Sequence, residues 1–253
     1  MEEEVIKPKL YSPSATVFIT VAIYFAAQLV AGILISIVPL IQHWSAAQTT
    51  DWLQTNVWAT FAFVILIEAA TLYLLHFFLK FRNLGFKNIG FNKPRAKYAA
   101  YALSGFAAYF VLYILGILIA KALVPGLDLE QKQELGFSTS TRGIELIPVF
   151  ASLVILPPIV EEIVARGFLF GGLRTKLPFV SAAIITSGLF AAAHLGEASD
   201  GLLWVAAVDT FILSLVLCYL REKTGSLWPS IGLHMIKNGL AFIVLFNIVQ
   251  YLK

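Results

Sequence analysis

Long apolar runs occur seven times in this sequence, and they constrain its fold more than any other feature. A transmembrane helix needs about 20 mostly apolar residues, because each residue advances ~1.5 Å and the hydrocarbon core of a bilayer is ~30 Å thick. Runs that meet or approach this length cover residues 15–41, 57–79, 98–120, 144–176, 177–196, 202–220 and 227–252. The sequence therefore predicts an all-α fold, a polytopic bundle of about seven transmembrane helices.

The composition agrees with an integral membrane protein. Hydrophobic residues make up 59% of the 253 residues, charged residues make up only 13%, and the mean hydropathy is +0.83. The first run is too long for the core of a signal peptide and follows the acidic stretch MEEEVIKPK, so we expect it to be an uncleaved helix. The single cysteine, Cys218, can form no internal disulfide.

Lysine and arginine residues are unevenly distributed between alternate loops. The tail before the first helix and the second, fourth and sixth loops together hold 13 of the 18 basic residues. The positive-inside rule then places the amino terminus, with a tail of residues 1–14, in the cytoplasm and the carboxyl terminus outside. The net charge of +3 thus reflects topology. We expect no nucleic-acid partner, and a lipid bilayer around the chain.

Polar side chains gather in three of the predicted helices. The set consists of Glu161, Glu162, Arg166, His194, His234 and Asn238. Charged groups cost about 2.5–3.5 kcal/mol each at the centre of a bilayer, so such groups usually mark a functional site. Residues four apart share a helix face, which pairs Glu162 with Arg166 and His234 with Asn238. The sequence therefore predicts a polar site buried among these helices.

The expected depths of these residues indicate which of them can meet. Glu161 and His194 lie fifteen and sixteen residues on either side of the predicted turn at 176–178, so both are roughly 23 Å from it. His234 and Asn238 lie about 10 and 16 Å above the start of the last helix, and they meet this level only if that helix begins deeper or the turn protrudes. We expect all four to surround one cavity, with one water bridging Glu161 and His194.

Three short motifs occur in order at helical spacing: EExxxR from residue 161, FxxxH from residue 190 and HxxxN from residue 234. Together they resemble the motifs of the CPBP intramembrane proteases, the family of CAAX prenyl endopeptidases and bacteriocin-processing or self-immunity proteins also called Abi. The resemblance covers roughly residues 144–250 and includes LREKTGSLWPSIGLH. It predicts a catalytic core at 144–253, preceded by three transmembrane helices and their loops at 15–143. Ala165 departs from the pattern, because the family commonly has an aromatic residue there.

The resemblance implies an intramembrane endopeptidase, and the side chains suit that chemistry. Peptide hydrolysis needs a base that activates water and donors that hold the oxyanion of the tetrahedral intermediate. Glu161 is the expected base, with His194 helping to orient or deprotonate the water. His234 and Asn238 are the expected oxyanion donors.

The remaining pair, Glu162 and Arg166, is expected to support the site through an ion pair. The resemblance further implies a membrane-associated peptide or protein as the substrate, either a prenylated carboxyl terminus or a leader-type peptide. It also implies a multi-pass protein of a bacterial inner or plasma membrane. The sequence does not distinguish between the substrate classes.

Other chemistries remain open at this point. Glu161, His194 and His234 are a candidate zinc set, but the sequence contains no HExxH motif, and a metal-free glutamate mechanism with no cofactor is favoured. A proton- or ion-coupled transporter would use the same carboxylates and histidines, although the internal repeats typical of transporters are not visible. A catalytically silent scaffold or immunity protein would keep the same fold.

Two adjacent prolines, Pro157 and Pro158, stand just before the glutamates. Proline offers no backbone N–H, and the second proline restricts the backbone of the first. We therefore expect the helix that begins near residue 144 to kink or unwind there and to free carbonyl groups beside the site.

Three further charges, Glu68, Asp209 and Lys237, lie well inside predicted spans. Counted from the inner helix ends, their depths are roughly 18, 18 and 15 Å. A lysine at this depth is expected to pair with an acid or, alternatively, to line a water-filled cavity without a partner. Because a short loop joins the helices of Asp209 and Lys237, we predict a contact between these two behind Asn238, with Glu68 as the second choice.

Overall fold

The structure is a computed structural model that describes residues 10–129, 131, 136–196 and 202–248. Over these residues the chain is helical and contains no β-strand, as the apolar runs predict. The segments η1 and η2 are 3₁₀ turns, and η3 and η4 are π-helical. In chain order the elements are α1 Pro13–Ile35, α2 Ile37–Ile41, α3 Ala46–Thr55, α4 Val57–Phe81, η1 Phe86–Ile89, α5 Lys97–Leu123, η2 Gly143–Glu145, α6 Leu146–Phe150, η3 Ala151–Ile155, α7 Leu156–Glu162, η4 Ile163–Leu169, α8 Phe170–Leu173, α9 Phe179–Ala193, α10 Trp204–Thr224 and α11 Trp228–Leu245.

Helices occupy all seven predicted runs, but not all are of spanning length. Five are long and apolar enough to cross a bilayer: Pro13–Ile41, Val57–Phe81, Lys97–Leu123, Gly143–Leu173 and Trp204–Thr224. The helix α9 is apolar but has only 15 residues, and α11 has 18 and carries polar motif residues. The polytopic helical bundle is therefore confirmed, while the number of seven spans stays a prediction. The end of the last run, 249–252, lies outside the described residues.

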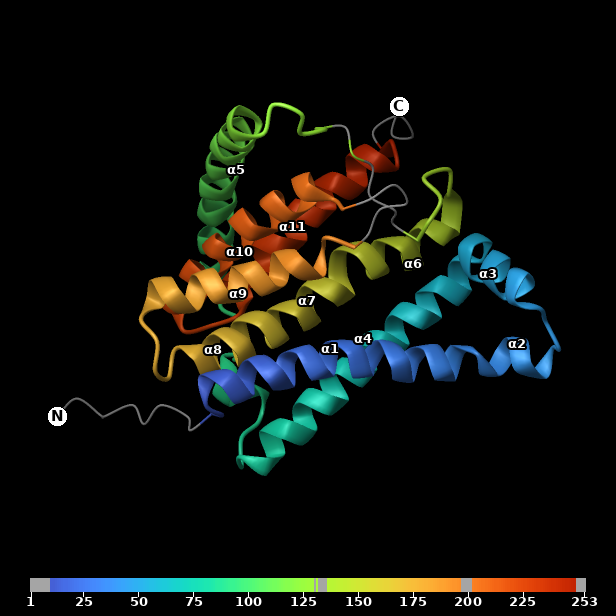
Figure 1. Cartoon of the computed structure of the whole chain (residues 1–253), viewed down its shortest axis with the longest axis horizontal. Helices are drawn as coiled ribbons and strands as arrows, with labels where there is room; N and C mark the ends of the chain where they lie inside the picture. Colours follow the sequence, from blue (N-terminus) through green and yellow to red (C-terminus); the bar gives the residue numbers. More distant parts are fainter. Residues whose placement is uncertain (1–9, 130, 132–135, 197–201, 249–253) are drawn as a thin grey trace.

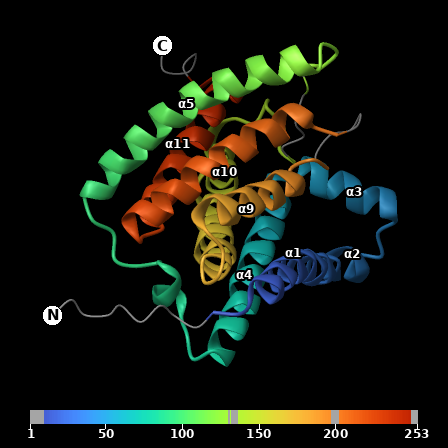
Figure 2. The same cartoon turned by 60° about the vertical axis from the view of Figure 1, so that its left-hand side comes forward.

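The segments from α6 to α8 follow one another directly and form one irregular helix through the middle of the molecule (Figure 1). Helices α1 and α4 pack together on one side of it, and α9, α10, α11 and α5 lie on the other (Figure 2). Among these four, α10 contacts α9, α5 and α11. The irregular helix, which carries both glutamates, therefore contacts both halves of the bundle.

Local sequence signals begin and end the helices. Ser12 accepts a hydrogen bond from the N–H of Ala15 at the start of α1, and Asn56 does the same for Ala59 at the start of α4. Gly225 ends α10 in the left-handed conformation, with φ 66°, which glycine adopts without strain. A tight α10–α11 hairpin results, and it keeps Asp209 and Lys237 on neighbouring helices.

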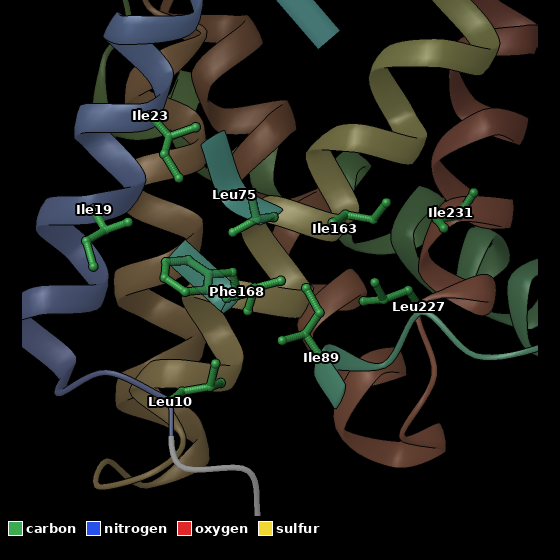
Figure 3. Close-up of a cluster of buried hydrophobic side chains, with 10 residues drawn as sticks. Leu10, Ile19, Ile23, Leu75, Ile89, Ile163, Phe168, Leu227 and Ile231 are labelled. Carbon is green, nitrogen blue, oxygen red and sulfur yellow. The ribbon is translucent and has the colours of Figure 1, made fainter. Parts of the chain in front are cut away.

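One hydrophobic cluster joins the amino-terminal helices to the predicted catalytic core (Figure 3). Its members come from α1 and the segment just before it, from α4, η1 and η4, and from α11 and its N-cap, and they are buried. The cluster consists of Leu10, Ile19, Ile23, Leu75, Leu79, Ile89, Ile163, Phe168, Leu227 and Ile231. At Gly172 the helices are so close that a Cβ atom would collide with Thr16 of α1. The domain boundary predicted near residue 143 stays a prediction, and apolar packing crosses it.

Candidate active site

The irregular helix is widened twice, once before and once after the glutamates. Its backbone is π-helical over Ala151–Ile155 and Ile163–Leu169, with the α-helical Leu156–Glu162 between them. A π-helix bonds residues five apart, which suits a segment where Pro157 and Pro158 offer no N–H to the preceding turn. The predicted irregularity before the glutamates is therefore confirmed, in the form of a wide turn rather than an unwound segment.

Asn238 satisfies a carbonyl group that the prolines leave without its usual partner. In a regular α-helix the oxygen of Leu153 would accept a hydrogen bond from the N–H of residue 157, which is a proline. Instead, Nδ2 of Asn238 donates to the Leu153 oxygen at 2.9 Å. The amide group has two hydrogens, so this bond attaches α11 to the widened turn and leaves one donor.

Glu162, Arg166 and His234 form a buried set of hydrogen bonds, called here the motif network. Oε1 of Glu162 accepts from Nη1 of Arg166 at 2.9 Å and from Nδ1 of His234 at 3.0 Å. Glu162 and Arg166 are fully buried. Because an ionised carboxylate only accepts, Nδ1 of His234 carries a proton, and Glu162 fixes the orientation of the imidazole ring. The predicted Glu162–Arg166 pair is confirmed, and its contact with His234 is an addition.

Phe190 connects the motif network to His194. The guanidinium carbon of Arg166 lies 4.3 Å from the centre of the Phe190 ring, a cation–π contact that stabilises the buried charge. The same ring lies 4.8 Å from the ring of His194 and 6.1 Å from that of His234. The aromatic residue of the FxxxH motif therefore contacts all three cationic or imidazole groups of the site.

Glu161 differs sharply from its neighbour Glu162. Its side chain is 33% exposed, against 0% for Glu162. Its Oε2 lies 3.7 Å from Nε2 of His234, which is too long for a direct hydrogen bond. Glu68 of α4 is close enough to interact electrostatically with Glu161. Glu161 is thus the accessible carboxylate of the pair, with an imidazole nitrogen close by.

His194 lies just after the last residue of α9. Its Nδ1 donates to the carbonyl oxygen of Phe190 at 2.8 Å, because a carbonyl can only accept. This bond leaves Nε2 as the ring nitrogen that has no hydrogen bond to the protein within the described residues. The structure brings both His194 and His234 against the ring of Phe190. The single water expected between His194 and Glu161 stays a prediction.

The predicted contact between Lys237 and Asp209 is confirmed. Nζ of Lys237 lies 3.0 Å from Oδ2 of Asp209, and the Tyr109 hydroxyl of α5 donates to Oδ1 of the same carboxylate. The sequence interpretation missed Tyr109. A depth count would have found it, because it lies twelve residues after Lys97 and hence roughly 18 Å deep, level with Asp209.

The candidate zinc ligands do not fit a metal centre in this arrangement. Among the described residues, no three His, Cys, Asp or Glu side chains are grouped so that they could hold a metal ion. Nδ1 of His194 and Nδ1 of His234 are hydrogen-bonded within the protein, which leaves Nε2 as the only ring nitrogen of each that a metal ion could bind. We therefore derive no step through a metal, and the zinc alternative is left to a chelator experiment.

Comparisons with known proteins place the resemblance in the same part of the chain as the three motifs. Residues 143–240 match the family model described as type II CAAX prenyl endopeptidase Rce1-like. The Bacillus subtilis (strain 168) protein named "Uncharacterized protein YyaK" is 34% identical over 139 residues, which cover 53% of this chain and 44% of that protein. The protein of the same organism named "Putative membrane peptidase YdiL" is 28% identical over 149 residues, 58% of this chain and 56% of its own length.

These matches confirm the resemblance to the CPBP family that the motifs indicated. The chain spans about half the length of the curated relatives that it matches. No solved structure matches the chain significantly.

Proposed function

From the similarity of residues 143–240 to Rce1-like CAAX endopeptidases, we propose that this chain is an intramembrane endopeptidase. It would hydrolyse a peptide bond of a membrane-associated substrate with a water activated by Glu161. The observation that carries the proposal is the contrast between the two glutamates. Glu162 is buried and its Oε1 is paired, whereas Glu161 is 33% exposed and faces the free ring nitrogen of His234.

In this proposal Glu161 acts as the general base. Its carboxylate accepts a proton from a water held near Nε2 of His194, and the resulting hydroxide attacks the carbonyl carbon of the scissile bond. The protonated Glu161 then gives its proton to the leaving nitrogen as the C–N bond breaks. The products are a carboxylic acid and an amine, which leave as a carboxylate and an ammonium after one proton passes between them, and Glu161 returns to its ionised state.

The oxyanion would be held from α11. Asn238 has one amide hydrogen left after its bond to Leu153. His234 can donate from Nε2 only as an imidazolium, because Nδ1–H already points to Glu162. Glu162 would therefore serve catalysis indirectly, through the orientation of His234.

The substrate class and the topology form the finer part of the proposal. A site among apolar helices suits a peptide carried to the membrane by a lipid group, a leader or its own span. The resemblance favours a prenylated carboxyl terminus or a leader-type peptide. The basic inner loops support an orientation in a bacterial plasma membrane with the amino terminus in the cytoplasm.

The test is comparative proteomics of membrane-associated peptides from cells that express wild type or Glu161→Gln. Glu145→Gln is the matched control, since it makes the same chemical change near the start of the irregular helix. Cleavage products present with wild type and the control but absent with Glu161→Gln are expected. Products that are equally abundant with Glu161→Gln would refute the assignment.

Metal dependence is tested on the purified protein. Incubation with a chelator is expected to leave the rate unchanged. A loss of activity that zinc alone restores would replace the glutamate mechanism by a zinc mechanism.

A further inference from the structure

A second polar network lies inside the bundle, outside the three motifs. Both oxygens of Asp209 on α10 are engaged: Oδ2 by Lys237 of α11 at 3.0 Å, and Oδ1 by the hydroxyl group of Tyr109 on α5. The Lys237 and Asp209 side chains are only 24% and 16% exposed. We call these three residues the Asp209 network. One carboxylate thus joins three helices.

The charges of Lys237 and Asp209 fix the position of α11 relative to α10 at this junction. An unpaired lysine or aspartate within the apolar bundle costs several kcal/mol. Sliding or rotation of α11 relative to α10 would separate Lys237 from Asp209. Both charges would then be unpaired, which is unfavourable by that amount. The apolar contacts between α5, α10 and α11, which include Leu213, Leu217 and Leu233, have no comparable directional preference.

The network is attached to the helical turn that carries two site residues. His234, Lys237 and Asn238 lie within five consecutive positions of α11. Lys237 points about 100° around the helix from Asn238. On one side, His234 bonds Glu162 and Asn238 bonds Leu153, while on another Lys237 bonds Asp209. This turn of α11 is therefore fixed from both sides.

We propose that Tyr109, Asp209 and Lys237 are positioning residues that hold His234 and Asn238 in register with Glu161. This inference rests on the proposed function. A rotation of α11 by about 10° moves a side-chain atom ~5 Å from the helix axis by about 1 Å. A displacement of that size at a catalytic group lowers a rate by about 100-fold. The network acts on the turnover rate and leaves substrate binding unchanged.

The variants Tyr109→Phe and Lys237→Met test the inference in the purified full chain. Tyr109→Phe removes only the hydroxyl group, and Tyr101→Phe makes the same change two turns earlier on α5 as the control. At a temperature where all variants are folded, Lys237→Met is expected to lower kcat by about 10- to 100-fold with KM within about twofold. Tyr109→Phe follows in the same direction with a smaller loss, and Lys237→Arg retains most of the rate.

A kcat within about twofold of wild type for both Tyr109→Phe and Lys237→Met would overturn the positioning role, and so would a change confined to KM. If Glu161→Gln still abolished cleavage in that case, the proposed function would stand without the inference. The two ideas therefore fail separately.

A second measurement does not depend on turnover. In protein labelled with ¹⁵N-histidine, the NMR signal of the proton on Nδ1 of His234 reports the hydrogen bond to Glu162. The signal is assigned by its change in the variant Glu162→Gln. Lys237→Met is expected to shift this resonance, whereas Tyr101→Phe leaves it in place. If the wild-type protein shows no peptidase activity but Lys237→Met still shifts the His234 resonance, the proposed function is refuted and the positioning role stands. An unchanged signal with Lys237→Met would refute the positioning role.

Discussion

Two polar networks flank α11, and they differ in how completely their hydrogen-bonding groups are used. In the Asp209 network both carboxylate oxygens have partners. In the motif network, Oε2 of Glu162 and two nitrogens of Arg166 have no hydrogen-bond partner within the described residues, although the Cys218 thiol lies beside the guanidinium. The fully engaged Asp209 carboxylate suits a structural junction, and the motif network adjoins the accessible Glu161.

The largest expected effect concerns the accessible carboxylate beside the motif network. Glu161→Gln keeps the shape of the side chain but removes the base, so turnover should fall by about 10²–10⁴-fold. Stability should change little, because the side chain is partly exposed. Cleavage rate and thermal unfolding in detergent measure the two quantities. A large loss of stability would mean that Glu161 belongs to the buried scaffold.

The next effect concerns the buried pair itself. Glu162→Gln removes the charge that compensates Arg166 and is expected to lower the free energy of unfolding by about 3–5 kcal/mol. The double variant Glu162→Gln/Arg166→Met should be less destabilised than the sum of the single variants, because no uncompensated charge remains. Strictly additive losses in denaturation experiments would mean that the pair is not coupled.

A smaller effect is expected where the motif network meets the widened turn. Asn238→Ala leaves the Leu153 carbonyl without its donor and should lower the free energy of unfolding by about 1–3 kcal/mol. Pro157→Ala supplies a backbone N–H to the same region. Added to Asn238→Ala, it should recover part of the loss, and a double variant no more stable than Asn238→Ala alone would contradict this account of the turn.

The smallest effect is expected at the end of α8 and α10, where Arg174 and Glu222 form a partly exposed pair. Nη2 of Arg174 lies 2.6 Å from Oε1 of Glu222, with side chains 27% and 38% exposed. The hydrogen bond with Glu222 raises the pKa of Arg174, so the guanidinium stays charged. Solvent screening limits such a pair to about 0–1 kcal/mol. Glu222→Gln should therefore change the midpoint of thermal unfolding only slightly, and high salt should remove even that difference. A loss as large as that of Glu162→Gln would contradict the comparison.

Much of the candidate site could be predicted from the sequence. A helix has a fixed rise per residue, so the number of residues from the end of a transmembrane helix gives the depth of a side chain in the membrane. The pairing of Asp209 with Lys237 followed from such counts and from a short connecting loop. The contact of Glu162 with Arg166 followed from their spacing of four. Both predictions need only the helix repeat and the high energy of isolated charges in apolar surroundings.

Other features could not be predicted in this way because they depend on backbone geometry. The prolines indicated a break but not its form, and the bond from Asn238 to Leu153 arises only once the turn is widened. The Nδ1 bond of His234 to Glu162 depends on how α11 is rotated against α7. The polar helix Ala46–Thr55, held by a capping box of Ser45 and Gln48, was not expected, since it lies outside the apolar runs.

The π-helical segment Ala151–Ile155 gives the helix a place where the residue count can change without moving the site. A wide turn accommodates one more residue than an α-turn, so the loss of a single residue there would let the helix return to regular α geometry. The residues downstream would keep nearly the same rotation about the helix axis, because the lost residue is the extra one of the turn. The loss of a residue from the α-helical stretch that precedes Glu161 would instead rotate Glu161 by about 100° relative to the upstream part. A one-residue deletion in a relative whose three motifs are all intact can therefore keep or abolish the site, depending on the turn from which the residue is lost.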